Sequence, residues 1–159
     1  MTRTLLVFSL IIALLLSACQ EAKPPASATG VTGKQITVPG GTYTDISVAE
    51  LQTMLANKDF TFINVHIPFE GDIAGTDQSI PYDEIEANLD KLPADKGAKI
   101  VLYCRSDRMS NIAAEKLVSL GYTNVWNLDG GMVAWEQAGL PLERYQFNPP
   151  SVADVRVGH

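Results

Sequence analysis

Short apolar runs alternate with amphipathic segments along this chain from about residue 42 onward. The runs at 60–65, 99–103 and 123–128 are largely apolar. Strands that are buried on both faces show such continuous runs, whereas strands with one solvated face alternate between apolar and polar residues. We therefore predict buried strands over these three runs and a shorter strand at 43–46.

Helical patterns separate the predicted strands. Ser47 and Glu50 have the spacing of a capping box, and the helix that follows carries its apolar residues on one face. Asp129 is the expected N-cap of the last helix. Three further helices are predicted, at 81–89, 111–120 and 129–137.

Strands that alternate with helices are typical of an α/β domain. We expect a central, mostly parallel sheet with helices on both faces, because parallel strands are joined by crossover helices. The length of 159 residues suggests one such domain, at 42–143. The segment 144–159, which contains Pro149 and Pro150, is predicted to be a loosely ordered C-terminal tail.

The first residues have the pattern of an export signal. Arg3 precedes an apolar stretch at 5–16, which is shorter than the roughly 20 residues of a membrane-spanning helix. Leu16-Ser17-Ala18-Cys19 resembles the lipobox of bacterial lipoproteins. The resemblance implies a signal peptide at 1–18, cleavage before Cys19 and lipidation of Cys19, and Gln20 at the next position resembles outer-membrane sorting. A plain secretory peptide or an uncleaved anchor is the alternative.

A lipidated Cys19 would make the protein a membrane-anchored lipoprotein that faces the periplasm. The following residues, to position 41, are rich in Pro, Ala, Ser, Thr and Gly, so we predict that 19–41 is the lipidated end and a flexible tether. The net charge of −6 gives the chain no electrostatic reason to bind nucleic acid. Attachment to the membrane would therefore depend on the lipid.

The chain has two cysteines, Cys19 and Cys104. If Cys19 carries lipid, no disulfide can join them, and Cys104 is a lone thiol in an oxidising compartment. Cys104 follows the predicted strand at 99–103 and precedes a helix. A helix N-terminus and the charges of Arg105 and Arg108 would stabilise a thiolate there. A buried and inert cysteine at a strand end is the alternative.

Two motifs resemble single-domain rhodaneses, which are sulfurtransferases. The first is 104–110, Cys-Arg-Ser-Asp-Arg-Met-Ser, beside the usual Cys-Arg-Ser-Gly-x-x-Ser, and the second is Gly-Gly-Met-Val-Ala-Trp at 130–135 with Gly-Leu-Pro at 139–141. The resemblance implies a rhodanese-like domain with Cys104 as the catalytic nucleophile and no cofactor. It also implies a substrate-binding loop of Arg105, Ser106, Asp107, Arg108, Met109 and Ser110.

Three positions depart from the family pattern. Asp107 replaces a common Gly, and although Asp tolerates unusual backbone angles, its carboxylate would lie among donors meant for an anion. Asn64 and His66 replace the Asp and Arg of the family's Asp-Val-Arg strand end. His66 is an auxiliary candidate that could move a proton or bind substrate, or it is an ordinary structural histidine. Ser110 is expected to cap the helix rather than contact the thiol.

Sulfur transfer is the leading hypothesis. Cys104 would take a sulfane sulfur from thiosulfate or a persulfide, hold it as a persulfide surrounded by backbone N–H groups, and pass it to a thiol or cyanide. Arg105 and Arg108 would attract the anionic donor or instead pair with acids. The alternative is a non-catalytic, membrane-tethered domain that carries sulfur or binds a protein.

Phosphatase and metal chemistry are not expected. Phosphatases of related fold resemble Cys-x5-Arg, and Ser110 stands where that Arg would be. The acids Glu70, Asp72 and Asp77 match no calcium-loop spacing.

Overall fold

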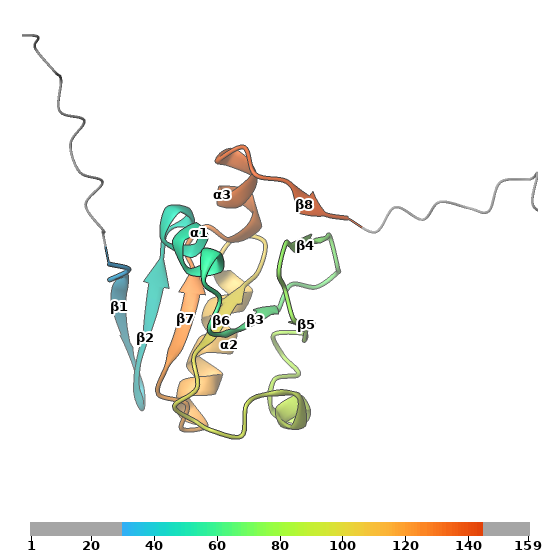
Figure 1. Ribbon diagram of the computed structural model, residues 1–159. Helices are drawn as coiled ribbons and strands as arrows, with labels where there is room; N and C mark the ends of the chain where they lie inside the picture. Colours follow the sequence, from blue (N-terminus) through green and yellow to red (C-terminus); the bar gives the residue numbers. More distant parts are fainter. Residues whose placement is uncertain (1–29, 145–159) are drawn as a thin grey trace, which may run out of the picture. The chain divides into compact units, whose positions relative to one another are not determined.

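A six-stranded sheet with helices on both faces forms the centre of the folded chain (Figure 1). The structure is a computed structural model, and it describes residues 30–144. The strand order is β1-β2-β7-β6-β3-β5, and every neighbouring pair is parallel except β1 with β2. The strands are β1 Lys34–Val38, β2 Gly41–Ile46, β3 Thr61–Asn64, β5 Gln78–Ser79, β6 Ile100–Tyr103 and β7 Val125–Leu128.

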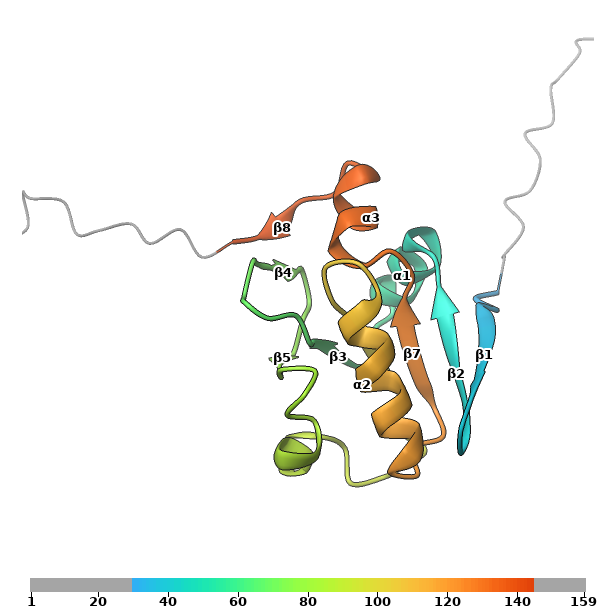
Figure 2. The same cartoon turned by 180° about the vertical axis from the view of Figure 1, so that it is seen from behind.

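One helix covers one face of the sheet and two cover the other. Figure 2 shows α2, Arg108–Ser119, in front of the sheet, where its apolar residues join one core cluster. Helices α1, Val48–Ala56, and α3, Gly131–Gln137, contribute to a second cluster on the opposite face. The remaining elements are the 3-10 helix η1 Glu86–Lys91 and a small antiparallel sheet of β4 Asp72–Ile73 with β8 Leu142–Glu143.

The predicted fold class is confirmed. The strands β3, β6 and β7 lie inside the three apolar runs, and all four residues of β6 are fully buried because both of its faces are covered. The capping box is also present, since Ser47 Oγ accepts from the Glu50 N–H at 3.3 Å and Glu50 Oε2 accepts from the Ser47 N–H at 2.9 Å. The sequence pattern thus places the central strands and α1 correctly.

The tether prediction is wrong for residues 34–41. Lys34–Val38 forms β1, which pairs antiparallel with β2 and places Ile36 opposite Tyr43. Ile36 and Val38 pack against the core. The small and polar residues around them in the sequence hide this pattern of buried positions.

The helix predicted at 81–89 is also wrong. A 3-10 helix begins only at Glu86, and Asn88 has the non-helical angles φ −120° and ψ 30°. Its side-chain amide donates to the Glu84 carbonyl at 2.8 Å. Asn side chains compete in this way with the backbone hydrogen bonds of a helix.

The predicted signal peptide, Cys19 and residues 145–159 of the predicted tail lie outside the described residues. Between residues 30 and 144, no helix has the length and hydrophobicity needed to cross a membrane.

Candidate active site

Cys104 follows the last residue of β6 at the carboxyl edge of the sheet. The neighbouring strands β3 and β7 are parallel to β6, so their carboxyl ends reach the same edge. Binding loops of open α/β sheets gather at this edge. Cys104 is a free cysteine, and only 2% of the residue is exposed. Such depth restricts attack to donors that present a narrow terminal atom to the sulfur.

The first turn of α3 fixes the backbone on one side of Cys104. The Met132 N–H donates to the Cys104 carbonyl at 2.9 Å, and the Val133 N–H donates to the Arg105 carbonyl at 3.0 Å. A trans peptide group holds its C=O and N–H on opposite sides. The N–H groups of Arg105 and Ser106 therefore point away from α3.

Several backbone donors around the loop remain available. Among the backbone N–H groups from Arg105 to Ser110, only that of Arg108 has an acceptor within residues 30–144. It donates to the Ser106 carbonyl at 3.1 Å. The positive end of the α2 dipole lies at the same place. Unpaired N–H groups of this kind can stabilise an anion bound beside them. The donors without an acceptor in the described part of the chain are the N–H groups of Arg105, Ser106, Asp107, Met109 and Ser110.

Gly131 is required for the close approach between α3 and the loop. A Cβ atom at this position would lie 2.3 Å from the Cys104 carbonyl oxygen and 2.8 Å from the backbone of Arg105. Its φ of +54° is also a conformation that side chains disfavour. The second glycine of the Gly-Gly motif thus lets α3 hold the cysteine loop.

Asp107 has the backbone conformation of a glycine, with φ 76°. The prediction that Asp could occupy this place is confirmed. Its carboxylate, however, accepts from the Gly130 N–H at 2.6 Å instead of standing free among the anion donors, which corrects that expectation. Burial, and then the charges of Asp129 and Asp45, raise the pKa of Asp107.

Gly130, and not Asp129, is the N-cap residue of α3. It adopts a left-handed conformation, with φ 75° and ψ −5°, and its N–H is the one that Asp107 accepts. The predicted cap at Asp129 is therefore wrong. The side chain that binds the backbone at the start of α3 is that of Asp107, from the start of α2.

Ser110 contacts the thiol rather than capping the helix as predicted. It is fully buried, and Asp107 is the N-cap residue of α2. The Ser110 hydroxyl lies 3.4 Å from Cys104 Sγ and 3.1 Å from the Asp107 carbonyl. A hydroxyl has one proton to donate, so these two bonds compete. Ser110 can thus donate to a thiolate or to a sulfur bound there.

The other predicted loop residues differ in their surroundings. Arg105 is 54% exposed and forms an ion pair with Glu70 from the neighbouring loop. Arg108 and Ser106 are exposed, and in the described part of the chain Arg108 forms no salt bridge. Met109 is half-buried and packs against the core. Of the two arginines, Arg105 is engaged by an acid and Arg108 is available to a ligand.

His66 lies beside Glu70 and does not hydrogen-bond to Cys104. Its side chain is 7% exposed, and its Nε2 lies 3.4 Å from Glu70 Oε1. The separation is that of an ion pair, and neither ring nitrogen has a hydrogen-bond partner in residues 30–144. His66 and Arg105 together lower the pKa of Glu70. The sequence analysis weighed Glu70 only as a metal ligand and allowed that Arg105 could pair with an acid, and the structure shows that Glu70 is this acid. The available signal was its place in a loop at the carboxyl edge.

Asn64 supports the loop that follows β3. Its amide donates to the Gly71 carbonyl at 3.0 Å and to Asp72 Oδ1 at 2.9 Å, and its oxygen accepts from the His66 N–H at 2.9 Å. Asp72 also accepts from the Tyr103 hydroxyl at 3.1 Å.

Among the described residues, no group of three or more His, Cys, Asp and Glu side chains is placed to hold a metal ion.

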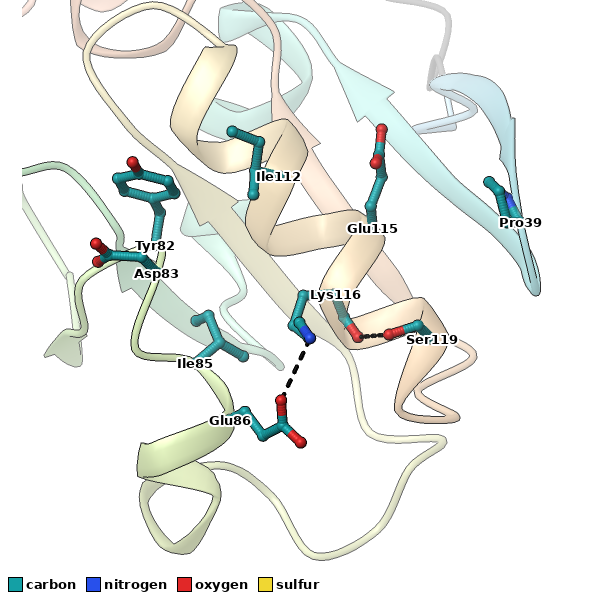
Figure 3. Close-up of a pocket in the computed structure, with 9 residues that line it drawn as sticks. All are labelled: Pro39, Tyr82, Asp83, Ile85, Glu86, Ile112, Glu115, Lys116 and Ser119. Carbon is teal, nitrogen blue, oxygen red and sulfur yellow. Dashed lines mark hydrogen bonds and ion pairs between the residues drawn. The ribbon is translucent and has the colours of Figure 1, made fainter.

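A groove of about 430 Å³ runs along α2 and does not include Cys104. Figure 3 shows that residues of α2, the turn after β1 and the segment before η1 line it. Lys116 lies 3.3 Å from Glu86 across this groove.

The model of the rhodanese-like domain matches residues 47–138, which is more than half of the chain. The chain belongs to the rhodanese-like family. The matched range contains both the cysteine loop and the Gly-Gly motif. The rhodanese-like resemblance drawn from those two motifs is therefore confirmed.

Similar proteins agree with this assignment. The chain is 32% identical to an uncharacterised protein of Synechocystis over 115 residues, which is 70% of this chain and 63% of that protein. It is 33% identical over 94 residues to a sulfurtransferase of Allochromatium vinosum, covering 57% of this chain and 85% of that protein. It is 26% identical to a tRNA uridine(34) hydroxylase of Erwinia tasmaniensis and spans 39% of its length.

Solved structures show the same rhodanese-like fold. The crystal structure of a rhodanese-related protein from Thermoplasma volcanium has a TM-score of 0.53 and 31% identity, covering 62% of this chain and 95% of that one. A rhodanese-like domain protein from Staphylococcus aureus has a TM-score of 0.53 and 28% identity, covering 63% and 98%. Together with the sulfurtransferase relative, these similarities support a function of the general sulfur-transfer type.

Proposed function

We propose that this rhodanese-like protein is a sulfurtransferase that carries sulfane sulfur on Cys104 as a persulfide. The observation that supports it most is the set of N–H groups around the end of β6 that have no acceptor within residues 30–144, because α3 binds the loop carbonyls instead. A persulfide ends in a negatively charged sulfur. Amide donors held in place before the reaction stabilise such a charge without reorganising.

The reaction would take place in two displacements. The Cys104 thiolate attacks the outer sulfur of a donor such as thiosulfate or a persulfide, forms a new S–S bond, and expels sulfite or a thiolate with the electron pair of the broken bond. A thiol or cyanide then attacks the terminal sulfur and releases the Cys104 thiolate. Ser110, at 3.4 Å from Sγ, would donate to the sulfur in both resting states.

A non-catalytic sulfur carrier or protein-binding domain is the second candidate. The 2% exposure of Cys104 favours it, because an acceptor must reach a deeply placed sulfur for turnover to occur. A sulfur carrier would differ from the enzyme in turnover and not in persulfide formation, whereas a protein-binding domain would need neither. Multiple turnovers with an intact Cys104 would support the enzyme.

Thiocyanate formation from thiosulfate and cyanide tests the proposal. We expect turnover by the full chain and none by Cys104→Ser, with Ser119→Ala as a control because Ser119 is exposed at the last residue of α2 and its hydroxyl donates to the Lys116 carbonyl, away from the cysteine loop. Loss of activity in the control alone, or equal rates above the protein-free blank in the wild type and Cys104→Ser, would contradict the assignment.

We also propose that the protein is a lipoprotein anchored in the membrane and facing the periplasm. The lipobox-like Leu16-Ser17-Ala18-Cys19 and its preceding apolar stretch support this localisation. Lipidation would provide the membrane affinity that an acidic chain lacks. Labelled fatty acid should enter the wild type and not Cys19→Ala, and equal labelling of both would exclude Cys19 as the lipidated residue.

A further inference from the structure

The ion pair between Arg105 and Glu70 changes the charge that a donor meets at the cysteine loop. Arg105 is the residue directly after Cys104, and its guanidinium is bound to Glu70 Oε2. The pKa of Glu70 is held below its ordinary value by His66 and Arg105, so the carboxylate is charged at neutral pH. The charge of Arg105 is therefore already neutralised when a donor arrives.

The remaining charges around the loop also oppose a highly charged anion. Asp107 stands in the loop itself, and Asp129 and Asp45 lie near enough to it to raise its pKa. Arg108 is the cation of the loop that no carboxylate engages in the described residues. The site thus provides neutral N–H donors for one charged sulfur but little net positive charge for a dianion.

We infer that Glu70 is a specificity-determining residue that makes the site select low-charge persulfide donors over dianionic donors such as thiosulfate. This inference rests on the proposed sulfur transfer and concerns the donor class alone. Thiosulfate must place a charged sulfonate beside the loop, and it can use Arg105 only if Glu70 releases it. A persulfide whose only charge is on the reacting sulfur needs the loop amides and not Arg105.

His66 gives Glu70 a second position. Its Nε2 lies 3.4 Å from the Glu70 oxygen that Arg105 does not bind, and both ring nitrogens are buried without hydrogen bonds in the described part of the chain. Buried polar atoms without partners are costly, so the imidazole can gain a hydrogen bond when Glu70 turns toward it. His66 would therefore act as a positioning residue for Glu70 and not as a catalytic one.

The test compares two donors in the wild type and in Glu70→Gln. Single-turnover formation of the Cys104 persulfide is measured with thiosulfate and with hydroxyethyl persulfide at several donor concentrations. Glu86→Gln is the matched control, because Glu86 is an exposed glutamate paired with Lys116 away from the loop. We expect Glu70→Gln to raise the second-order rate constant for thiosulfate by about two- to fivefold, the range of one exposed ion pair. The persulfide rate should stay unchanged.

Two further results decide the inference. The gain with thiosulfate should disappear in the double variant Glu70→Gln/Arg105→Gln, because the released cation is then absent. Rates with thiosulfate should fall more steeply with added salt in Glu70→Gln than in the wild type. Equal changes for both donors, the same gain in Glu86→Gln, or no gain with thiosulfate would overturn the role of Glu70.

Failure of this inference can be separated from failure of the proposed function. If the wild type forms a persulfide with either donor but Glu70→Gln does not change their ratio, only the donor selection is wrong. If no donor modifies Cys104 in any variant, the sulfur-transfer proposal fails and takes the inference with it.

Discussion

The Asp107 carboxylate accepts a hydrogen bond from the Gly130 N–H at 2.6 Å and thereby joins the start of α2 to the start of α3. Asp107 is the N-cap residue of α2, yet its side chain makes no capping bond to its own helix. The contact instead holds the cysteine loop against the helix that binds its carbonyl groups. A residue that departs from the usual family glycine is therefore part of the support of the site.

Asp107→Asn should change how stability depends on pH. Burial raises the pKa of Asp107 in the folded state, so the native protein binds more protons than the unfolded chain between the unfolded pKa of about 4 and the raised folded value. Protonation of Asp107 thus stabilises the folded state. This contribution to the unfolding free energy is fully present below the unfolded pKa and is lost as pH rises through the folded pKa. Asn resembles the neutral acid, can still accept from Gly130, and tolerates positive φ.

We therefore expect Asp107→Asn to gain stability relative to the wild type as pH rises from about 4 to 7. Urea unfolding at the two pH values measures this difference, and Asp90→Asn, at an exposed position, is the control. A difference that is constant with pH, or larger in acid, would show that Asp107 is not the group responsible.

Gly131→Ala should displace the cysteine loop. The new Cβ would lie 2.3 Å from the Cys104 carbonyl oxygen at a φ of +54°, so the loop must move and the backbone is strained. We expect a loss of about 1–3 kcal/mol of unfolding free energy. The rate of persulfide formation should fall on the order of a hundredfold, because small displacements of a reacting group are costly.

Gly139→Ala separates strain from displacement. Gly139 has φ +79°, but a Cβ there would meet nothing within 4 Å. This variant should lose stability through strain and keep its rate of sulfur transfer. Equal losses of activity in the two variants would argue against a specific role of Gly131 in holding the loop.

Asn64→Asp, which restores the usual family residue, should destabilise this protein. Asn64 is 1% exposed, and its amide donates to the Gly71 carbonyl and to Asp72. A carboxylate cannot donate these bonds and would be repelled by Asp72. We expect a loss of about 2–4 kcal/mol at neutral pH, measured by urea unfolding, and a smaller loss in acid where the new carboxyl is protonated.

Asn124→Asp is a suitable comparison for this change. The Asn124 amide also donates to a carbonyl, that of Gly97 at 3.1 Å, but at the surface. Its substitution should cost much less than that of Asn64. A similar cost at both positions would mean that burial and the charge of Asp72 do not determine the effect.

Much of the fold follows from local patterns in the sequence. The apolar runs define β3, β6 and β7, and Ser47 with Glu50 marks the start of α1. The order of strand, cysteine and helix places Cys104 at the carboxyl ends of the strands, because neighbouring parallel strands end on the same side of the sheet. These features depend on residues close in sequence, so periodicity and capping rules are sufficient to predict them.

The features that were missed depend on contacts between distant segments. Glu70 reaches Arg105 from a loop 35 residues away, and Asp107 reaches Gly130 across 23 residues. Strand β1 is stabilised by pairing with β2 although few of its residues are apolar. The sequence shows the residue types in each case but not which partner each of them finds in the folded chain.

The most direct measurement is the mass of the Cys104 peptide after the full chain is treated with a sulfane donor. Sulfur transfer through Cys104 predicts an increase by the mass of one sulfur atom on that peptide. The addition should be removed by a thiol acceptor and should be absent in Cys104→Ser. A Cys104 peptide that keeps its unmodified mass with every donor, in a folded protein, would contradict sulfur transfer through Cys104.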